Sequence, residues 1–267
     1  MENFLTEDLG VPSNRIQLLV GSKDHTSVDD PLCPSRGHIV DALLSLITNS
    51  EIAYDDNIII YYSGHGSYYP PHPEEDSETD YIETLSPIDR DTLGDDGNHV
   101  PDISDREFNT ILFLISRAKG HRITVILDCC HAGGVSRNLP EPGARVSPSM
   151  QRATLQDMLV AGETALMRYP GYRSILGKDW LPDTTSHVVL AACEDYQFAK
   201  AKKVRGEDGT AAGYIGIFTD SLVRALCSGH WTKETTYVDL LRCLDTTSSQ
   251  TPVAAGKHRG ARLWYQD

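Results

Sequence analysis

The sequence predicts an α/β protein with a mainly parallel central sheet flanked by helices. Two runs of β-branched and apolar residues, 57–62 and 123–127, have the composition of strands that are buried on both faces. Segments with apolar residues at helical spacing lie between such runs, and this alternation is typical of a parallel sheet. The chain has 267 residues, which suits one α/β domain.

In the first half of the chain, we expect the order strand, helix, strand, loop and helix. Residues 15–21 form a short apolar run that predicts the first strand. Ser35 is a suitable N-cap for a helix whose apolar residues recur at helical spacing. After the strand at 57–62, residues 67–102 lack sustained periodicity and predict a long loop, in which residues 80–89 form a short hairpin arm.

The next helix is expected to begin after Ser104, with Glu107 at the position that completes a capping box. Gly120 ends this helix, and the second buried strand follows. Residues 135–186 contain five prolines and form a second long irregular region, with one helix near residues 153–167. A loop of this length in a compact domain is usually functional or disordered.

The last third of the chain repeats the alternation. Residues 187–193 predict a strand, followed by a glycine-bearing loop. Helices are expected at residues 216–226 and 237–244, and a final strand at residues 261–265.

Composition and charge exclude several classes of function. Lys and Arg total 24 and Asp and Glu total 38, so the formal net charge is -14. An acidic protein is a poor partner for nucleic acids and for anionic membranes, and a better partner for basic substrates. No apolar run approaches membrane-spanning length, and the six cysteines lack zinc-type spacing. We therefore expect no nucleic-acid or membrane partner, and a reducing compartment, either cytoplasm or nucleus.

The chemistry concentrates at the ends of the two buried strands. His65 follows the first strand between two glycines, and Cys130 follows the second. The carboxyl ends of parallel strands are where open α/β sheets bind their ligands. A cysteine nucleophile needs a base to become a thiolate, and donors for the oxyanion that forms. His65 and Cys130 are the catalytic candidates, and the amides of Gly66 and Cys130 are the expected oxyanion donors.

Strand alternation favours Cys130 over its neighbour as the nucleophile. Side chains alternate between faces along a strand, so Asp128 and Cys130 would share one face and Cys129 would point to the other. Asp128 would then be a carboxylate in the same pocket, and Cys129 a small core residue. The alternative is structural: a single His at a strand end is more often hydrogen-bonded than catalytic. The Gly-His-Gly context and the second reactive strand favour the dyad.

The motifs resemble those of one family. Ser-Gly-His-Gly at residues 63–66 and Asp-Cys-Cys-His-Ala-Gly at residues 128–133 resemble the two catalytic blocks of the metacaspases, caspase-like peptidases. Further stretches agree in order: residues 87–89 with 103–105, residues 191–197, and residues 216–219. No single motif is specific, but their order along the chain is.

The resemblance implies a caspase-like fold and a thiol endopeptidase that cuts after Arg or Lys. One domain would span residues 1–267, with a large-subunit-like part at 1–134, a linker at 135–186 and a small-subunit-like part at 187–267. By the same resemblance, His65 is the base and Cys130 the nucleophile. Ser63 and Asp128 match positions that line the pocket for the basic side chain. A carboxylate there would pair with a guanidinium or ammonium group.

The chain also departs from the family pattern. Residues 15–20 resemble the second strand of metacaspases, so the first strand and a pocket Asp near it are missing. Many metacaspases bind calcium beside the dyad. Asp80 and Asp105 match such positions, but Ser104 and Arg137 stand where acidic residues are common. We expect no required cofactor, with calcium at Asp80 and Asp105 as a weak alternative.

Two classes of function remain open at this point. The first is an endopeptidase acting on protein or peptide substrates with Arg or Lys at the cleavage site. The second is a caspase-like interaction or regulatory module with weak or no activity. The linker at 135–186 carries several basic residues, so an enzyme of the first class is expected to cut its own linker. These residues are Arg137, Arg145, Arg152, Arg168, Arg173 and Lys178. The sequence does not predict an oligomeric state.

Overall fold

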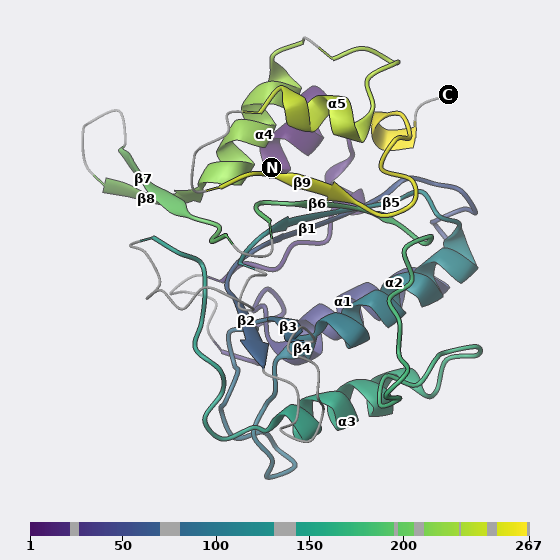
Figure 1. The fold of residues 1–267 in the computed structure, drawn as a ribbon, viewed down its shortest axis with the longest axis vertical. Helices are drawn as coiled ribbons and strands as arrows, with labels where there is room; N and C mark the ends of the chain where they lie inside the picture. Colours follow the sequence, from purple (N-terminus) through teal and green to yellow (C-terminus); the bar gives the residue numbers. More distant parts are fainter. Residues whose placement is uncertain are drawn as a thin grey trace.

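The central feature is a four-stranded sheet with the order β1-β5-β6-β9 (Figure 1). Strands β1 (Ile58–Ser63), β5 (Ile123–Asp128) and β6 (Val188–Ala191) are parallel, and β9 (Val253–Ala255) is antiparallel to β6. The structure is a computed structural model. It describes residues 1–21, 27–69, 81–130, 143–194, 197–205, 211–229, 231–244 and 250–265. The predicted α/β class with a mainly parallel sheet is confirmed.

Helices cover both faces of this sheet (Figure 1). On one face lie α1 (Arg36–Thr48) and α2 (Asp105–Lys119), and α3 (Leu155–Leu166) packs beyond α2. On the other face lie α4 (Ile217–Cys227) and α5 (Tyr237–Arg242), with the N-terminal helical turn η1 at Phe4–Asp8 against α4. Each face has its own apolar core: the α1/α2 core lies under the first pair of helices and the α4/α5 core under the second. In the described part of the chain, no helix has the length and hydropathy needed to cross a membrane.

Two smaller sheets flank the carboxyl ends of the central strands. One contains β2 (Gly66–Tyr69), β3 (Ile82–Leu85) and β4 (Ile103–Ser104), all antiparallel. The other is a hairpin of β7 (Ala201–Arg205) and β8 (Ala211–Gly216), which projects from the body in Figure 1. The predicted arm at residues 80–89 is therefore the β3 strand, although residues 70–80 lie outside the described part. The hairpin β7–β8 was missed because its glycines indicated only a loop.

The predicted helix caps are largely confirmed. Ser35 accepts a hydrogen bond from the amide of His38, and Ser104 accepts one from the amide of Glu107. The other half of the predicted capping box, in which the Glu107 side chain would accept from the Ser104 amide, is wrong. The Glu107 carboxylate is fully buried and binds the Arg36 guanidinium at 2.7 and 2.9 Å. A buried carboxylate gains more from a cation than from one backbone amide.

Two predicted strands are absent. The residues of 15–21 form no strand; Leu19 packs on the α1/α2 core and the amide of Val20 donates to Leu32. The expected final strand at 261–265 is instead a short helical turn, Leu263–Tyr265. Trp264 and Tyr265 have positive φ angles of 54° and 48°, which no strand accommodates. Both are buried aromatic residues, so burial in the core outweighs their strand propensity.

The buried ion pair between α1 and α2 gives a stability prediction. Glu107→Ala should lower the free energy of unfolding by about 3–5 kcal/mol, because Arg36 would keep its charge without its partner. Urea unfolding followed by circular dichroism measures this change. The double variant Arg36→Met, Glu107→Leu removes both charges and should recover most of the loss. A loss below about 1 kcal/mol in the single variant would contradict the prediction.

Candidate active site

The predicted dyad residues lie just beyond the carboxyl ends of two neighbouring strands of the central sheet. Strands β1 and β5 are adjacent and parallel, with Ser63 opposite Asp128 in the register. His65 and Cys130 each follow two residues beyond this pair, so the sheet brings both chain turns to the same edge. Strand register therefore brings together the segments that carry the predicted thiol and imidazole.

The two adjacent cysteines point to opposite faces, as strand alternation predicts. Cys129 packs in the α1/α2 core, whereas Cys130 lies in the α4/α5 core with Ile126. Asp128 shares the Cys130 face, where its carboxylate meets Thr219 at the start of α4. Both cysteines are buried, but only Cys130 and Asp128 face the same side of the sheet end.

A segment of the predicted linker crosses this edge in an extended form. The carbonyl of Arg145 accepts hydrogen bonds from the amides of Gly66 at 3.1 Å and Cys130 at 3.4 Å. The Arg145 amide donates to the carbonyl of Ala199 at 2.9 Å, and the amide of Ala201 donates to Gly143 at 2.9 Å. The two backbone amides expected to stabilise an oxyanion thus both contact one carbonyl of this chain.

The Arg145 side chain occupies the pocket predicted from Ser63 and Asp128. Its Nη1 donates to Ser63 Oγ and to the Asp128 carbonyl, both at 2.7 Å, and lies 3.3 Å from Asp128 Oδ1. The Arg145 side chain is 15% exposed and the Asp128 side chain is fully buried. The other oxygen, Oδ2, accepts from the Thr219 amide at 3.1 Å and from the Thr219 hydroxyl. The pocket holds an arginine between a hydroxyl and a buried carboxylate.

The surroundings of both predicted dyad residues favour their uncharged forms. Burial raises the pKa of the Cys130 thiol to about 12, and the thiol donates to the Ala199 carbonyl at 3.4 Å. Partial burial, followed by the charge of Arg145, lowers the pKa of His65 below its ordinary value. The His65 ring also hydrogen-bonds to the backbone of Val146. The Arg145 carbonyl therefore contacts the Cys130 amide, and the next residue, Val146, contacts the imidazole.

Comparisons with known proteins identify the family of this chain. Residues 1–139 match the model of the metacaspase, peptidase C14 domain. The chain belongs to the metacaspase family. It is 30% identical over 135 residues to Metacaspase-6 of Arabidopsis thaliana, and the matched region covers 51% of this chain and 32% of the relative. It is 28% identical over 172 residues to Metacaspase-1 of Cryptococcus neoformans, covering 62% of this chain and 35% of the relative. The chain spans about a third of the length of these curated relatives.

The fold of this metacaspase also resembles a solved structure. A crystal structure of a Geobacter sulfurreducens protein covers 84% of this chain and 74% of its own, with a TM-score of 0.52 and 20% identity. At this level of identity the likeness concerns the fold alone. The division into a large-subunit-like part, a linker and a small-subunit-like part stays a prediction.

Calcium binding at Asp80 and Asp105 stays a prediction, because only one of the two candidates lies in the described residues. Asp80 lies outside them, as does Arg137. Asp105 begins α2, and its carboxylate accepts from the amide of Arg106 at 2.7 Å. Burial, with the nearby charge of Glu83, raises the pKa of Asp105 to about 6. Among the described residues, no group of three His, Cys, Asp or Glu that could hold a metal ion is found.

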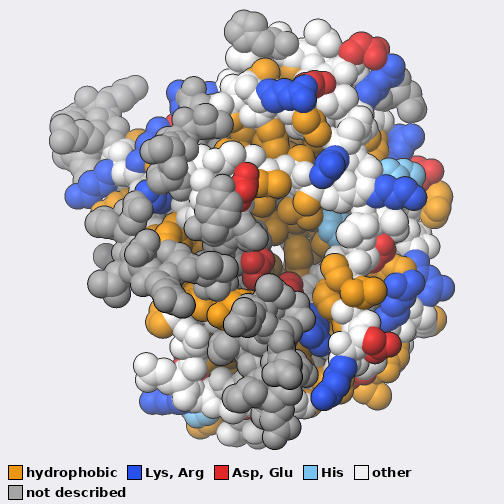
Figure 2. Space-filling model, in the orientation of Figure 1, with side chains coloured by type: hydrophobic (Ala, Val, Ile, Leu, Met, Phe, Trp, Pro, Cys, Tyr) orange, Lys and Arg blue, Asp and Glu red, His pale blue; other side chains and the backbone are white. Residues whose placement is uncertain are grey.

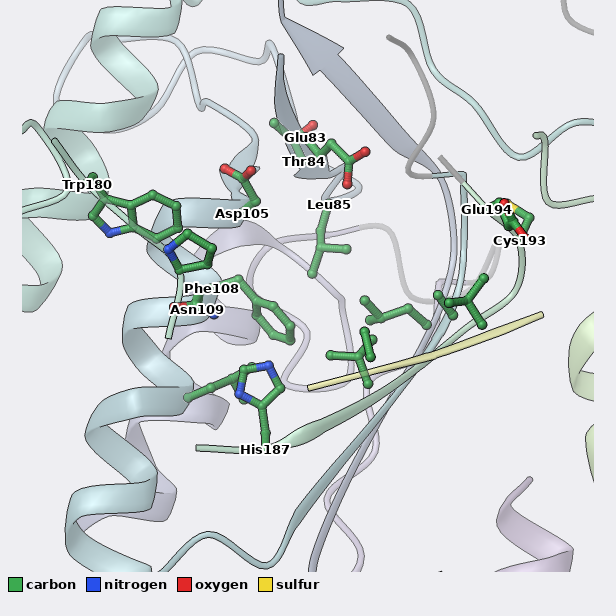
Figure 3. Close-up of a pocket in the computed structure, with 17 residues that line it drawn as sticks. Glu83, Thr84, Leu85, Asp105, Phe108, Asn109, Trp180, His187, Cys193 and Glu194 are labelled. Atoms are coloured by element: carbon green, nitrogen blue, oxygen red, sulfur yellow. The ribbon is translucent and has the colours of Figure 1, made fainter. Parts of the chain in front are cut away.

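A cavity of about 630 Å³ lies on the other face of the sheet, between α2 and strands β6 and β9. Figure 2 shows apolar side chains around a hollow, with acidic side chains beside it. In the close-up, Phe108 and Trp180 lie along one wall, Glu83 and Asp105 at one end, and His187 at the other (Figure 3). Its lining includes Leu127 of the α1/α2 face and neither Cys130 nor His65. The cavity is thus separate from the candidate active site.

Sequence reasoning missed the partners that complete the site. Arg145 was one of six basic residues in the linker, and no local signal distinguished it from the others. Ala199 acts through its backbone carbonyl, which carries no residue-specific signature. Thr219 lies in the 216–219 stretch, but its contacts with Asp128 were not predicted. The best available signal was the start of α4, because a helix N-terminus stabilises a nearby anion.

The raised pKa of Cys130 gives a reactivity prediction for the resting protein. Cys130 should react slowly with iodoacetamide at neutral pH, because its thiol is buried and little thiolate is present. Cys243 is exposed and serves as the comparison within the same sample. Peptide mapping by mass spectrometry measures both rates. Labelling of Cys130 as fast as that of Cys243 would show that the resting thiol is accessible and ionised.

Proposed function

We propose that this metacaspase is a cysteine endopeptidase that cuts peptide bonds after Arg or Lys. Cys130 is the nucleophile and His65 the base. The observation that carries the proposal is the position of Arg145 and its contacts. Its carbonyl meets two backbone amides while its guanidinium meets a buried carboxylate. A substrate arginine needs both contacts together, because the first polarises the carbonyl and the second fixes its position.

The reaction follows from these positions. His65 takes the proton of the Cys130 thiol, and the sulfur adds to the carbonyl carbon of the substrate residue before the scissile bond. The oxygen gains negative charge and is stabilised by the amides of Gly66 and Cys130. The tetrahedral intermediate collapses as the imidazolium gives its proton to the leaving nitrogen. Water then hydrolyses the thioester, with His65 again as the base.

The preference for a basic residue rests on Asp128 and Ser63. The fully buried carboxylate would be costly without a cation, so an apolar or acidic substrate side chain leaves it poorly paired. A guanidinium can reach both the Ser63 hydroxyl and the Asp128 carbonyl, as Arg145 does. A lysine ammonium supplies the charge but fewer fixed donors, so we expect Arg to exceed Lys.

The dyad assignment predicts different outcomes for the two adjacent cysteines. Cys130→Ala should abolish cleavage of a short reporter peptide that ends in Arg. Cys129→Ala should largely spare it, because Cys129 packs in the α1/α2 core. His65→Ala should behave like Cys130→Ala, since little correctly placed thiolate forms without the base. Equal loss from both cysteine variants would reject Cys130 as the sole nucleophile.

Matched reporters that end in Arg, Lys or Asp, with and without calcium, complete this experiment. Asp128→Asn should reduce cleavage after Arg by an amount on the order of 2–5 kcal/mol in transition-state stabilisation, because a buried charge pair is lost. Faster cleavage of the Asp reporter than of the Arg reporter would refute the specificity. Wild-type protein that cleaves none of them would favour the alternative, an inactive interaction module.

We propose that the expected self-cleavage in the linker occurs at one bond, Arg145–Val146, because Arg145 already contacts the predicted pocket and oxyanion donors. Incubated wild-type protein should yield fragments of residues 1–145 and 146–267, and Cys130→Ala should yield none. Arg145→Gln should suppress this cut, because the amide cannot neutralise Asp128. The first-order rate should not depend on protein concentration, because the segment already lies in its own site. Intact-mass spectrometry over time measures the fragments.

Arg152→Gln is the matched control for this prediction. Arg152 belongs to the same segment, but its amide binds Asp91 away from the pocket, so the cut at Arg145 should persist. Cuts that appear equally in Cys130→Ala would indicate a contaminating protease. A cut confined to another basic residue of the linker would show that Arg145 is held without being a substrate.

A further inference from the structure

The chain that follows Arg145 runs along strand β2. Val146 bridges Gly66 in a parallel arrangement, and the amide of Ser147 donates to the Gly66 carbonyl at 2.8 Å. The hydroxyl of Ser149 donates to the Tyr68 carbonyl at 3.2 Å. The segment after the proposed scissile bond is thus held by backbone contacts, as an added strand would be.

One side chain interrupts this backbone pairing. Arg90 Nη2 donates to the carbonyl of Pro148 at 3.0 Å, the third residue after Arg145. Pro148 has no amide proton, so its backbone can form a hydrogen bond only as an acceptor, through its carbonyl. The amide of Met150 then donates to the Tyr69 hydroxyl at 2.9 Å. Arg90 and Tyr69 therefore contact the segment at points that the β2 backbone does not.

Arg90 is held rigidly for this contact. Its Nε and Nη2 bind the two oxygens of Asp102, each at 2.7 Å, and the Tyr69 hydroxyl donates to Asp102 at 2.8 Å. Asp102 is fully buried, and the Arg90 side chain is 18% exposed. Burial alone would lower the pKa of Arg90. The hydrogen bond to Asp102 and its negative charge outweigh this effect and raise the pKa of Arg90. A paired, planar guanidinium fixed in this way presents one donor in a defined direction.

We propose that Arg90, oriented by Asp102 and Tyr69, is a substrate-binding residue that recognises the carbonyl of the third residue after the scissile bond. This rests on the proposed endopeptidase function, with Arg145 in the place of the substrate arginine. The recognised group is a backbone carbonyl, so the side chain at that position is not selected and proline is accepted. The preferred substrates are extended polypeptides that continue at least three residues past the cut.

Two substrates separate this role from a general effect on the enzyme. The first is a short reporter in which Arg is joined directly to a fluorescent amine, so nothing reaches Arg90. The second is a quenched peptide with the same residues up to Arg, five residues beyond it, and an amidated carboxyl end. Both are assayed with Arg145→Gly protein, so that in every variant the competing segment lacks the side chain that binds Ser63 and Asp128. Assays at pH 8 keep His65 neutral even if loss of the nearby Arg90 charge raises its pKa.

Arg90→Lys keeps the charge but loses the two-point contact with Asp102. Its KM for the long peptide should rise about tenfold, as expected for one lost hydrogen bond from a charged donor. Its kcat/KM for the short reporter should change less than about twofold. Because Arg90→Ala would leave Asp102 buried and unpaired, Arg90→Met with Asp102→Asn is the second variant, and it should behave like Arg90→Lys. A long peptide amidated after the second residue should be insensitive to both.

The outcomes are distinguishable. An equal loss on both substrates would overturn the proposal, because Arg90 would then support the fold or the dyad. An unchanged KM for the long peptide, with the short reporter still cleaved, would overturn it and leave the endopeptidase function standing. No cleavage of the short reporter by protein with Arg90 intact would overturn both.

Discussion

Asp128 carries a fully buried carboxylate at the carboxyl end of β5, and the candidate active site is arranged around this charge. A buried carboxylate is stable only where donors or cations inside the protein replace water. The start of α4 supplies the amide and hydroxyl of Thr219, and Arg145 supplies a guanidinium. These donors come from distant parts of the sequence, so satisfying one charge fixes both α4 and residues 143–147 against the sheet end. The position of Arg145 then determines which carbonyl meets the amides of Gly66 and Cys130.

The approach of α4 to this carboxylate requires the absence of one side chain. A Cβ atom on Gly216 would lie 1.8 Å from Asp128 Oδ2, far closer than nonbonded atoms allow. With glycine at the N-cap, the first turn of α4 directs the Thr219 amide at the carboxylate, and the positive end of the helix dipole adds to its effect. Tyr61 of β1 holds the Thr219 hydroxyl from the other side at 2.9 Å. Thr219 and Tyr61 therefore hold one oxygen of the Asp128 carboxylate in place, while the other faces the Arg145 guanidinium.

The sequence predicted the parts of this arrangement that depend on local pattern. Apolar runs identified β1 and β5, alternation separated Cys129 from Cys130, and the Ser35 and Ser104 caps marked the starts of α1 and α2. Where tertiary contacts decide the outcome, local pattern was insufficient. An apolar run became a strand only where a partner strand was available, and the run at 15–21 pairs with no strand in the described part of the chain. The seating of Arg145 depends on an irregular segment pairing with β2 and Ala199, which no periodicity encodes.

On the proposed reaction, the contacts that hold residues 143–150 are the same ones a substrate would use. A tethered ligand competes at the effective concentration set by its own linker, which can reach the millimolar range, so a free peptide must displace a strong local competitor. The Ala199 carbonyl strengthens this block, because it accepts from both the Arg145 amide and the Cys130 thiol. The thiol must leave this carbonyl before it can reach His65. Cutting the bond after Arg145 does not by itself empty the site, since Ser147, Pro148 and Met150 remain bound on the far side. What cleavage changes is the tether: the two halves become separate ligands, each held by fewer contacts, and each can then be displaced independently by a longer substrate.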